Sequence, residues 1–240
     1  MRIQKFAFFF LLMAVSITAK AQTADEIVAK YVAFTGGLQK WKSITSIVSS
    51  GMYNYGGISF PFKAYSKSPD LYEYTVIANG KSFKQGYNGK IGWRIDGFKD
   101  ETKKTILTGK DALAIANESD VALETPFINY KHKGFAVTLE GKDTVDKKPC
   151  FKIKLTRKNG DTENYFFDSN NFALIKKQAV SKNTELDKSM LDIFFSDYHF
   201  DEGFNSPHKI TYTANGQEIL IITVDQVKLN EQIDNSIFQP

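Results

Sequence analysis

The spacing of hydrophobic residues changes once along the chain, near Ile44. Before that point, apolar side chains recur every three to four residues, which predicts one face of an amphipathic helix. They are Ile27, Tyr31, Phe34 and Leu38. Thr23-Ala24-Asp25-Glu26 has the form of a capping box and predicts the start of this helix. Gly36-Gly37 is expected to end or bend it, and a short turn through Trp41 follows.

After Ile44, apolar and polar residues alternate in short segments, which is typical of half-buried strands. The clearest segments are Ile58 to Ala64, Tyr72 to Val76, Phe135 to Leu139, Phe151 to Leu155 and Ile219 to Ile221. Turn signals separate them at Gly56-Gly57, Asn79-Gly80, Asn88-Gly89, Asn159-Gly160 and Asn215-Gly216. Asn-Gly pairs favour tight hairpins because both residues tolerate positive φ. The pattern predicts a mainly β fold with about ten antiparallel strands.

One segment interrupts this pattern. Residues 110–117 are rich in alanine and predict a helix, and Ser119 is expected to cap a second short helix that ends near Pro126. An interruption of this length is too long for an ordinary connection, so the insert at Lys110 to Phe127 is expected to cover one face of the sheet. No internal repeat is visible, and residues 22–240 are predicted to form one domain.

The first 21 residues have the pattern of a cleaved secretory signal peptide. Arg2 and Lys5 precede the uncharged, apolar residues 6–18, and Ala19-Lys20-Ala21 provides a small-x-small cleavage site. The apolar run is too short to span a bilayer, although an uncleaved anchor is the alternative. No cysteine stands at the cleavage point for lipid attachment. The protein is therefore predicted to be periplasmic, with secretion as the alternative, and to lack an integral membrane segment.

Charge and cysteine content narrow the possible functions. The 31 basic residues exceed the 27 acidic ones, but Arg2, Lys5 and Lys20 lie in the predicted signal, which leaves 28 against 27. A near-neutral mature chain gives no electrostatic argument for nucleic-acid binding. The single cysteine, Cys150, excludes an internal disulfide, so the core has to hold the domain together.

Several short motifs, taken in order, resemble those of a known family. They are Thr35-Gly36-Gly37, Ser68-Pro69-Asp70-Leu71-Tyr72, Gly86 to Trp93, Gly134 after the insert, Gly203 to Ile210, Val227-Lys228-Leu229-Asn230 and the closing Phe238. This order resembles the outer-membrane lipoprotein-sorting proteins of Gram-negative bacteria, which have the LolA-like fold. The resemblance extends over nearly all of residues 22–240.

The resemblance implies a single curved antiparallel sheet that forms an unclosed half-barrel, covered by the N-terminal helix and the helical insert. The space between sheet and helices would accept a hydrophobic small molecule or the acyl chains of a lipid or lipoprotein. Each buried CH₂ group contributes about 0.8 kcal/mol, so a few methylene groups suffice for binding. The expected protein is a monomeric carrier. An envelope sensor or protein-interaction module without cargo is the alternative, because a fold does not determine its function.

The residues expected to contact such a ligand are mostly aromatic and lie in the first half of the chain. They are Tyr53, Tyr55, Phe60, Phe62, Tyr72, Tyr74 and Trp93, together with Arg94, Leu113 and Phe127. Ordinary core packing also accounts for any single aromatic residue among them. The family implies an arginine that holds the helical cover closed. Arg94 is the preferred candidate over Arg157, and a solvated strand position is the alternative for both.

The sequence gives no pattern that indicates catalysis. His132, His199 and His208 are the three histidines. His199 and His208 could surround a metal with Asp201 or Glu202, but the usual metal-site spacings are missing. Neither a serine-hydrolase elbow nor a phosphate-binding glycine loop is present, and Cys150 fits a small apolar core position better than a catalytic thiol. We therefore expect no enzyme, no metal and no cofactor.

Overall fold

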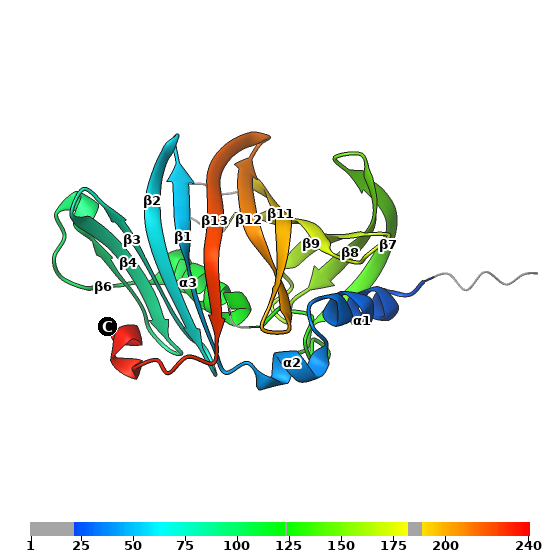
Figure 1. Cartoon of the computed structure of the whole chain (residues 1–240), viewed down its shortest axis with the longest axis horizontal. Coiled ribbons are helices and arrows are strands. Elements are labelled where there is room, and N and C mark those ends of the chain that lie inside the picture. Colours follow the sequence, from blue (N-terminus) through cyan, green and yellow to red (C-terminus); the bar gives the residue numbers. More distant parts are fainter. Residues whose placement is uncertain (1–21, 123, 182–188) are drawn as a thin grey trace, which may run out of the picture.

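The chain folds around one antiparallel sheet that is not closed into a barrel, as a computed structural model shows (Figure 1). The structure describes residues 22–122, 124–181 and 189–240. The predicted signal peptide, residues 1–21, lies outside these residues. Within them the sheet has thirteen strands, three more than the alternation predicts, and the mainly β half-barrel prediction is confirmed.

The strands follow one another across the sheet almost in sequence order. From one edge to the centre they are β6 (Thr105–Ile106), β5 (Gly92–Asp96), β4 (Lys81–Asn88), β3 (Leu71–Ala78), β2 (Ile58–Lys67) and β1 (Ser46–Tyr55). From the centre to the other edge they are β13 (Gln217–Leu229), β12 (Phe204–Ala214), β11 (Met190–Asp201), β10 (Leu174–Val180), β9 (Thr162–Asp168), β8 (Lys148–Thr156) and β7 (Ala136–Val145). The exception is the central pair, in which β1 lies beside β13.

The N-terminal helix is α1 (Ala24–Phe34), and its predicted capping box is present. The Thr23 backbone N–H donates to Glu26 Oε2 at 2.9 Å, and the Glu26 N–H donates to Thr23 Oγ1 at 3.2 Å. Gly36 and Gly37 both have positive φ and separate α1 from the short helix α2 (Leu38–Ser43). The Trp41 indole N–H, which donates to Thr35 Oγ1 at 2.8 Å, ties the two helices together.

The main hydrophobic core lies between α1, residues 125–130 and strands β8 and β9. Tyr31 and Phe127 pack edge to face, and both contact Phe167 on β9. Ile153 and Leu155 on β8 are completely buried beneath them. This half of the sheet is therefore closed by tight packing.

The helical insert forms one helix, α3 (Gly109–Ala122). The prediction that Ser119 caps a second helix is wrong, because Ser119 lies within α3 and its hydroxyl donates to the Ala116 carbonyl at 2.9 Å. Residues 126–134 form turns that run beneath α1 instead. Among the described helices, none is both long and apolar enough to cross a membrane.

Helix α3 contacts β3, β4 and β5 on the opposite side of the sheet from the viewer in Figure 1. Its Ile115 side chain is fully buried against Gly92 on β5. A Cβ atom at Gly92 would lie 2.5 Å from Ile115 Cγ2, so only glycine allows this close approach.

The other face of β5 is covered by the C-terminal segment. Trp93 is buried there, and its indole N–H donates to the Phe238 carbonyl at 2.8 Å. Phe238 belongs to the 3₁₀ turn η3 (Asn235–Phe238) and is fully buried. A second 3₁₀ turn, η1 (Gly97–Lys99), follows β5.

We expect the close approach between Gly92 and Ile115 to set the position of α3. Gly92→Ala should lower the free energy of unfolding by about 1–3 kcal/mol, because it overpacks this contact. In the Ile115→Ala background the same change should cost much less, since the Cγ2 atom that it would meet is gone. Denaturant unfolding of the wild type, both single variants and the double variant measures this coupling. Additive effects would show that α3 does not rest on Gly92.

Candidate ligand-binding site

The strand register places most of the predicted aromatic residues on one face of the sheet. Directly opposed residues in antiparallel strands share a face, and residues two apart along a strand do too. Tyr53 lies opposite Phe60, and Ala64, on the Phe60 face of β2, lies opposite Tyr74. The shared face thus carries Tyr53, Tyr55, Phe60, Phe62, Tyr72 and Tyr74.

The same register identifies this face as the one that α3 covers. Tyr74 lies opposite Gln85, which lies opposite Arg94. Arg94 is two residues from Gly92, the contact of Ile115 on α3. The half of this helix-covered face on β1 to β5 is called the tyrosine face below. It comprises Tyr53, Phe60, Phe62, Tyr72, Tyr74 and Arg94.

The tyrosine face is packed much less tightly than the core beneath α1. All six of its residues are half-buried. Its rings nevertheless contact one another: Tyr72 and Tyr74 are 5.9 Å apart between ring centroids, and Tyr74 and Phe83 are 5.8 Å apart. Side chains of this kind offer apolar area together with hydroxyl groups that can form hydrogen bonds.

Glu118 on α3 introduces a carboxyl group on this side of the sheet. It lies one helical turn after Ile115, which places both residues on the sheet-facing side of α3. The Glu118 side chain is exposed to water, yet the protein around it raises the pKa of Glu118 to about 7 through desolvation, against a smaller opposing effect of Lys177. After burial, the charge of Glu118 is the next cause that raises the pKa of Tyr72 and Tyr74.

The charge of Glu118 also affects tyrosine residues on strands nearer the centre of the sheet. Burial, followed by the charge of Glu118, also raises the pKa of Tyr53 to about 12 and that of Tyr212 on β12 above its ordinary value. Neither Glu118 nor Tyr212 is among the residues predicted from the sequence. For Glu118, the available signal in the sequence is an acidic residue three positions after an apolar residue of the alanine-rich segment. For Tyr212, it is the two-residue spacing from Ile210, which is typical of one face of a strand.

A buried ion-pair network lies at the other end of the covered face. Glu163 on β9 lies 2.7 Å from Lys177 Nζ and 3.3 Å from Arg157 Nε, and it accepts from the Tyr165 hydroxyl at 2.9 Å. Burial acts to raise the pKa of Glu163, but Lys177 and Arg157 outweigh it and lower the pKa overall. Arg157 therefore has a structural ion-pair role beside the core.

Three of the predicted site residues lie away from the tyrosine face, and a fourth, Tyr55, lies on the same side of the sheet but at its exposed end. Trp93 is 2% exposed and occupies the opposite face, under Phe238. Phe127 is 2% exposed and belongs to the core beneath α1. Leu113 on α3 is 43% exposed, and Tyr55 is 61% exposed at the β1–β2 turn.

A separate hollow of about 590 Å³ lies between α1 and residues 127–132. Val28, Val32 and Leu38 contribute apolar walls, and an ion pair between Asp25 and Lys131 at 2.6 Å borders it.

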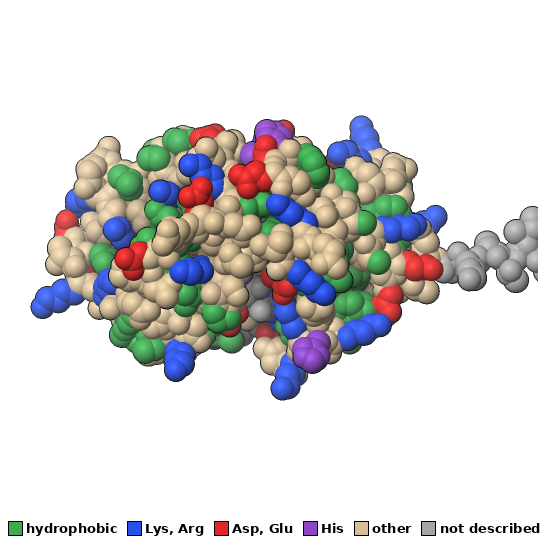
Figure 2. All heavy atoms as spheres, turned by 60° about the horizontal axis from the view of Figure 1, so that its bottom comes forward, with side chains coloured by type: hydrophobic (Ala, Val, Ile, Leu, Met, Phe, Trp, Pro, Cys, Tyr) green, Lys and Arg blue, Asp and Glu red, His purple; other side chains and the backbone are tan. Residues whose placement is uncertain are grey.

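The face shown in Figure 2 has basic and acidic side chains interspersed, with no area of a single charge sign.

The cysteine and the three histidines, which are the side chains considered for catalysis or metal binding, have different surroundings. Cys150 is fully buried, and burial raises the pKa of its thiol, which disfavours the reactive thiolate. His132 is exposed in the turns after α3. The structure brings His199, Asp201 and His208 together, although these residues are separated in sequence and the sequence predicted no metal site.

No protein-family model matches this sequence, and no curated protein is similar to it at a significant level. The similarity is visible at the level of structure. A DUF1329 family protein from Desulfovibrio piger aligns with a TM-score of 0.59 and 13% identity, covering 91% of this chain and 98% of the other.

Two further similar structures are described by the name of a superfamily or by a role in lipoprotein sorting. A LolA superfamily protein from Nitrosomonas europaea aligns with a TM-score of 0.58 and 14% identity, covering 92% of this chain and 99% of that one. A structure described as an outer membrane lipoprotein-sorting protein domain, from Vibrio parahaemolyticus, aligns with a TM-score of 0.59 and 10% identity, over 90% and 95% of the two chains. The protein thus has a LolA-like fold, as its sequence motifs predicted.

We expect Glu118 to make stability depend on pH. Its pKa of about 7 in the folded protein exceeds the ordinary value of 4.5, so the folded state binds more protons between these values. Stability should therefore fall as the pH rises from 4.5 to 7, and then level off. Glu118→Gln should reduce this slope, leaving the part due to buried Glu73, whose pKa is also raised by burial. It should exceed the wild type in unfolding free energy by about 1 kcal/mol at pH 8, a value reduced because the side chain is exposed to water.

Denaturant unfolding at pH 5 and pH 8 measures this difference. Glu218→Gln, at an exposed position of β13, is the matched control and should leave the pH dependence of the wild type unchanged. Parallel pH profiles for the wild type and Glu118→Gln would contradict the assignment of Glu118 to the covered face.

Proposed function

We propose that this protein is a periplasmic carrier that binds the acyl chains of a lipid or lipoprotein between the tyrosine face and α3. The observation that supports this proposal most directly is the contrast between the two halves of the covered face. The half beneath α1 is closed by fully buried side chains, whereas the aromatic side chains opposite α3 are half-buried. Half-buried aromatic area is what an apolar ligand would cover.

The chemistry of the tyrosine face favours an amphipathic ligand. Ring faces on Phe60, Phe62 and Tyr74 suit methylene groups, each worth about 0.8 kcal/mol when removed from water. Tyrosine hydroxyls and the Glu118 carboxyl group can form hydrogen bonds with ester or hydroxyl groups near the head of a lipid. At neutral pH a carboxyl group with a pKa of about 7 is partly protonated, so it can donate as well as accept.

Transport by a soluble carrier also agrees with the predicted signal peptide and with the similarity to a lipoprotein-sorting domain. At 10% identity that similarity extends only to the fold, so the cargo follows from the chemistry of the tyrosine face. In this proposal the protein acts without a cofactor and as a monomer.

Lipid uptake by the purified chain tests the proposal. Native mass spectrometry should show co-purified lipid, and the delipidated chain should bind a fluorescent fatty-acid analogue saturably. Tyr74→Ala should weaken that binding about tenfold, which corresponds to ~1.4 kcal/mol, because one wall of the binding face is lost.

Tyr65→Ala is the matched control. Tyr65 lies on the strand next to that of Tyr74, on β2 opposite Glu73, and therefore on the other face of the sheet. It should leave the binding unchanged. If the chain never retains or takes up lipid, or if both variants lose affinity equally, the carrier function is wrong. A protein partner that stays bound after delipidation would then favour an interaction module of the same fold.

A further inference from the structure

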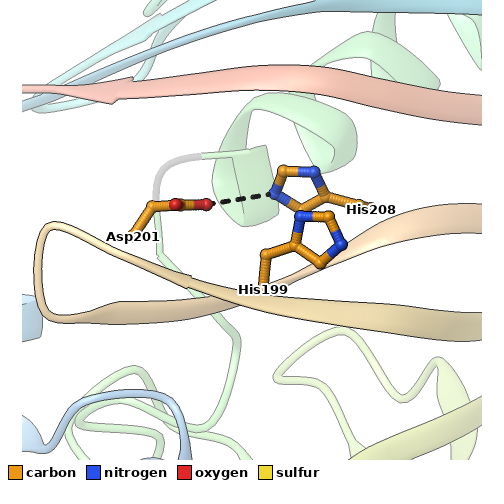
Figure 3. A group of neighbouring side chains, drawn as sticks. All are labelled: His199, Asp201 and His208. Carbon is orange, nitrogen blue, oxygen red and sulfur yellow. Dashed lines mark ion pairs between the residues drawn. The ribbon is translucent and has the colours of Figure 1, made fainter.

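A compact group of metal-ligand side chains lies where β11 turns into β12, apart from the tyrosine residues (Figure 3). His199 and Asp201 come from the end of β11, and His208 comes from β12. One possible ligand atom from each of the three residues lies within 4.8 Å of the others. We propose that His199, Asp201 and His208 form a binding site for a divalent transition-metal ion, with Zn²⁺ as the best-fitting ion.

His208 is a buried histidine whose ring is not fully satisfied by hydrogen bonds within the described part of the protein. Its side chain is buried, with the whole residue 3% exposed, and its Nε2 atom has no hydrogen-bond partner. Asp201 Oδ2 lies 3.5 Å from it, which forms an ion pair only when the ring is protonated and is too long for a good hydrogen bond. A buried polar atom without a partner is costly, and a bound ion is one of the few arrangements that explain it.

His199 has a carboxylate partner at one of its two ring nitrogens. Its Nε2 atom lies 3.1 Å from Asp197 Oδ1. When Nε2 carries the proton and donates to that carboxylate, Nδ1 keeps its lone pair for a metal. Histidines that bind metals usually donate their other ring N–H to a carboxylate or carbonyl in this way, which fixes the tautomer and makes the nitrogen a better ligand.

The backbone of the hairpin explains why the three side chains meet. Asp197 has a φ of 53° within β11, a conformation that interrupts the regular strand. Glu202 and Gly203, also with positive φ, form the tight turn between Asp201 and Phe204. His199 pairs with Ser206, so His208, two residues further along β12, lies on the same face, and the two imidazole rings stack at 4.0 Å with 26° between their planes. The hairpin is held to the end of α1 by the Asn205 N–H, which donates to the Thr35 carbonyl at 3.2 Å.

The chemical types of the three ligands indicate which ion would bind, and the freedom of two of them to move indicates how tightly. Two imidazoles and one carboxylate suit Zn²⁺ and leave one coordination position open. Tetrahedral zinc with bonds of about 2.0–2.1 Å needs ligand atoms about 3.4 Å apart, closer than the present separation. The half-exposed side chains of His199 and Asp201 have room to move toward the fixed His208. We therefore expect binding in the micromolar range rather than the tight binding of a preformed structural site.

Titration of the untagged, EDTA-treated chain with ZnCl₂, followed by calorimetry, tests the site. One equivalent should bind, and the melting temperature should rise with zinc concentration. His199→Ala and Asp201→Asn should each weaken binding at least about tenfold, as loss of a direct ligand does. Both residues are exposed, so these variants should fold like the wild type, which circular dichroism checks.

His132→Ala is the matched control, because it removes the remaining histidine at an exposed position away from the hairpin. It should bind zinc like the wild type. The proposal is overturned if zinc does not bind saturably, if the double variant of His199 and Asp201 still binds it, or if His132→Ala abolishes binding. In the first case an ordered water molecule would be the better partner for His208.

Discussion

The structure depends on one geometric constraint, which is that a strongly curved sheet left open at both edges has to cover its concave face. The two helices solve this problem differently. Helix α1 and the turns after α3 close one half with a dry aromatic core around Phe167. Helix α3 closes the other half through the close approach of Ile115 to Gly92, and leaves the tyrosine rings half-buried. In the proposed function, stability and ligand binding depend on different parts of the same sheet.

The acidic residues Glu163 and Glu118 differ between the two halves of the covered face in a similar way. Near the dry core, Glu163 is neutralised by Lys177 and Arg157, which is how buried charges are normally accommodated. Opposite the tyrosine face, Glu118 is exposed, and its pKa stays raised because Lys177 offsets the desolvation by the surrounding protein only in part. An incompletely compensated group is a liability in a core, but in a binding region it supplies a partner for a ligand. The difference between the two acids therefore agrees with the division between a structural and a functional half.

Local sequence patterns were sufficient for the elements and for the class of fold. The Thr23 capping box, the paired glycines after α1 and the Asn-Gly turns each specify local geometry, and each lies where it was predicted. The site was less predictable. Alternation placed Tyr72 and Tyr74 on one face correctly, but it could not show that Trp93, one residue from Arg94, would pack under the distant Phe238. The meeting of His199 with His208 follows from the register between β11 and β12, which the local sequence pattern did not specify.

The pairing of β1 with β13 at the centre of the sheet has a consequence for the order of folding. These strands lie near opposite ends of the described chain, as do Trp93 and its partner Phe238 to a lesser degree. Contacts between such distant segments carry a large loop-closure entropy and form slowly. Until the last residues arrive, β1 remains an unpaired edge that can pair with another chain. The protein is thus most prone to aggregation before β13 has been synthesised and can pair with β1. Changes in β13 are therefore expected to affect the yield of folded protein more than its final structure.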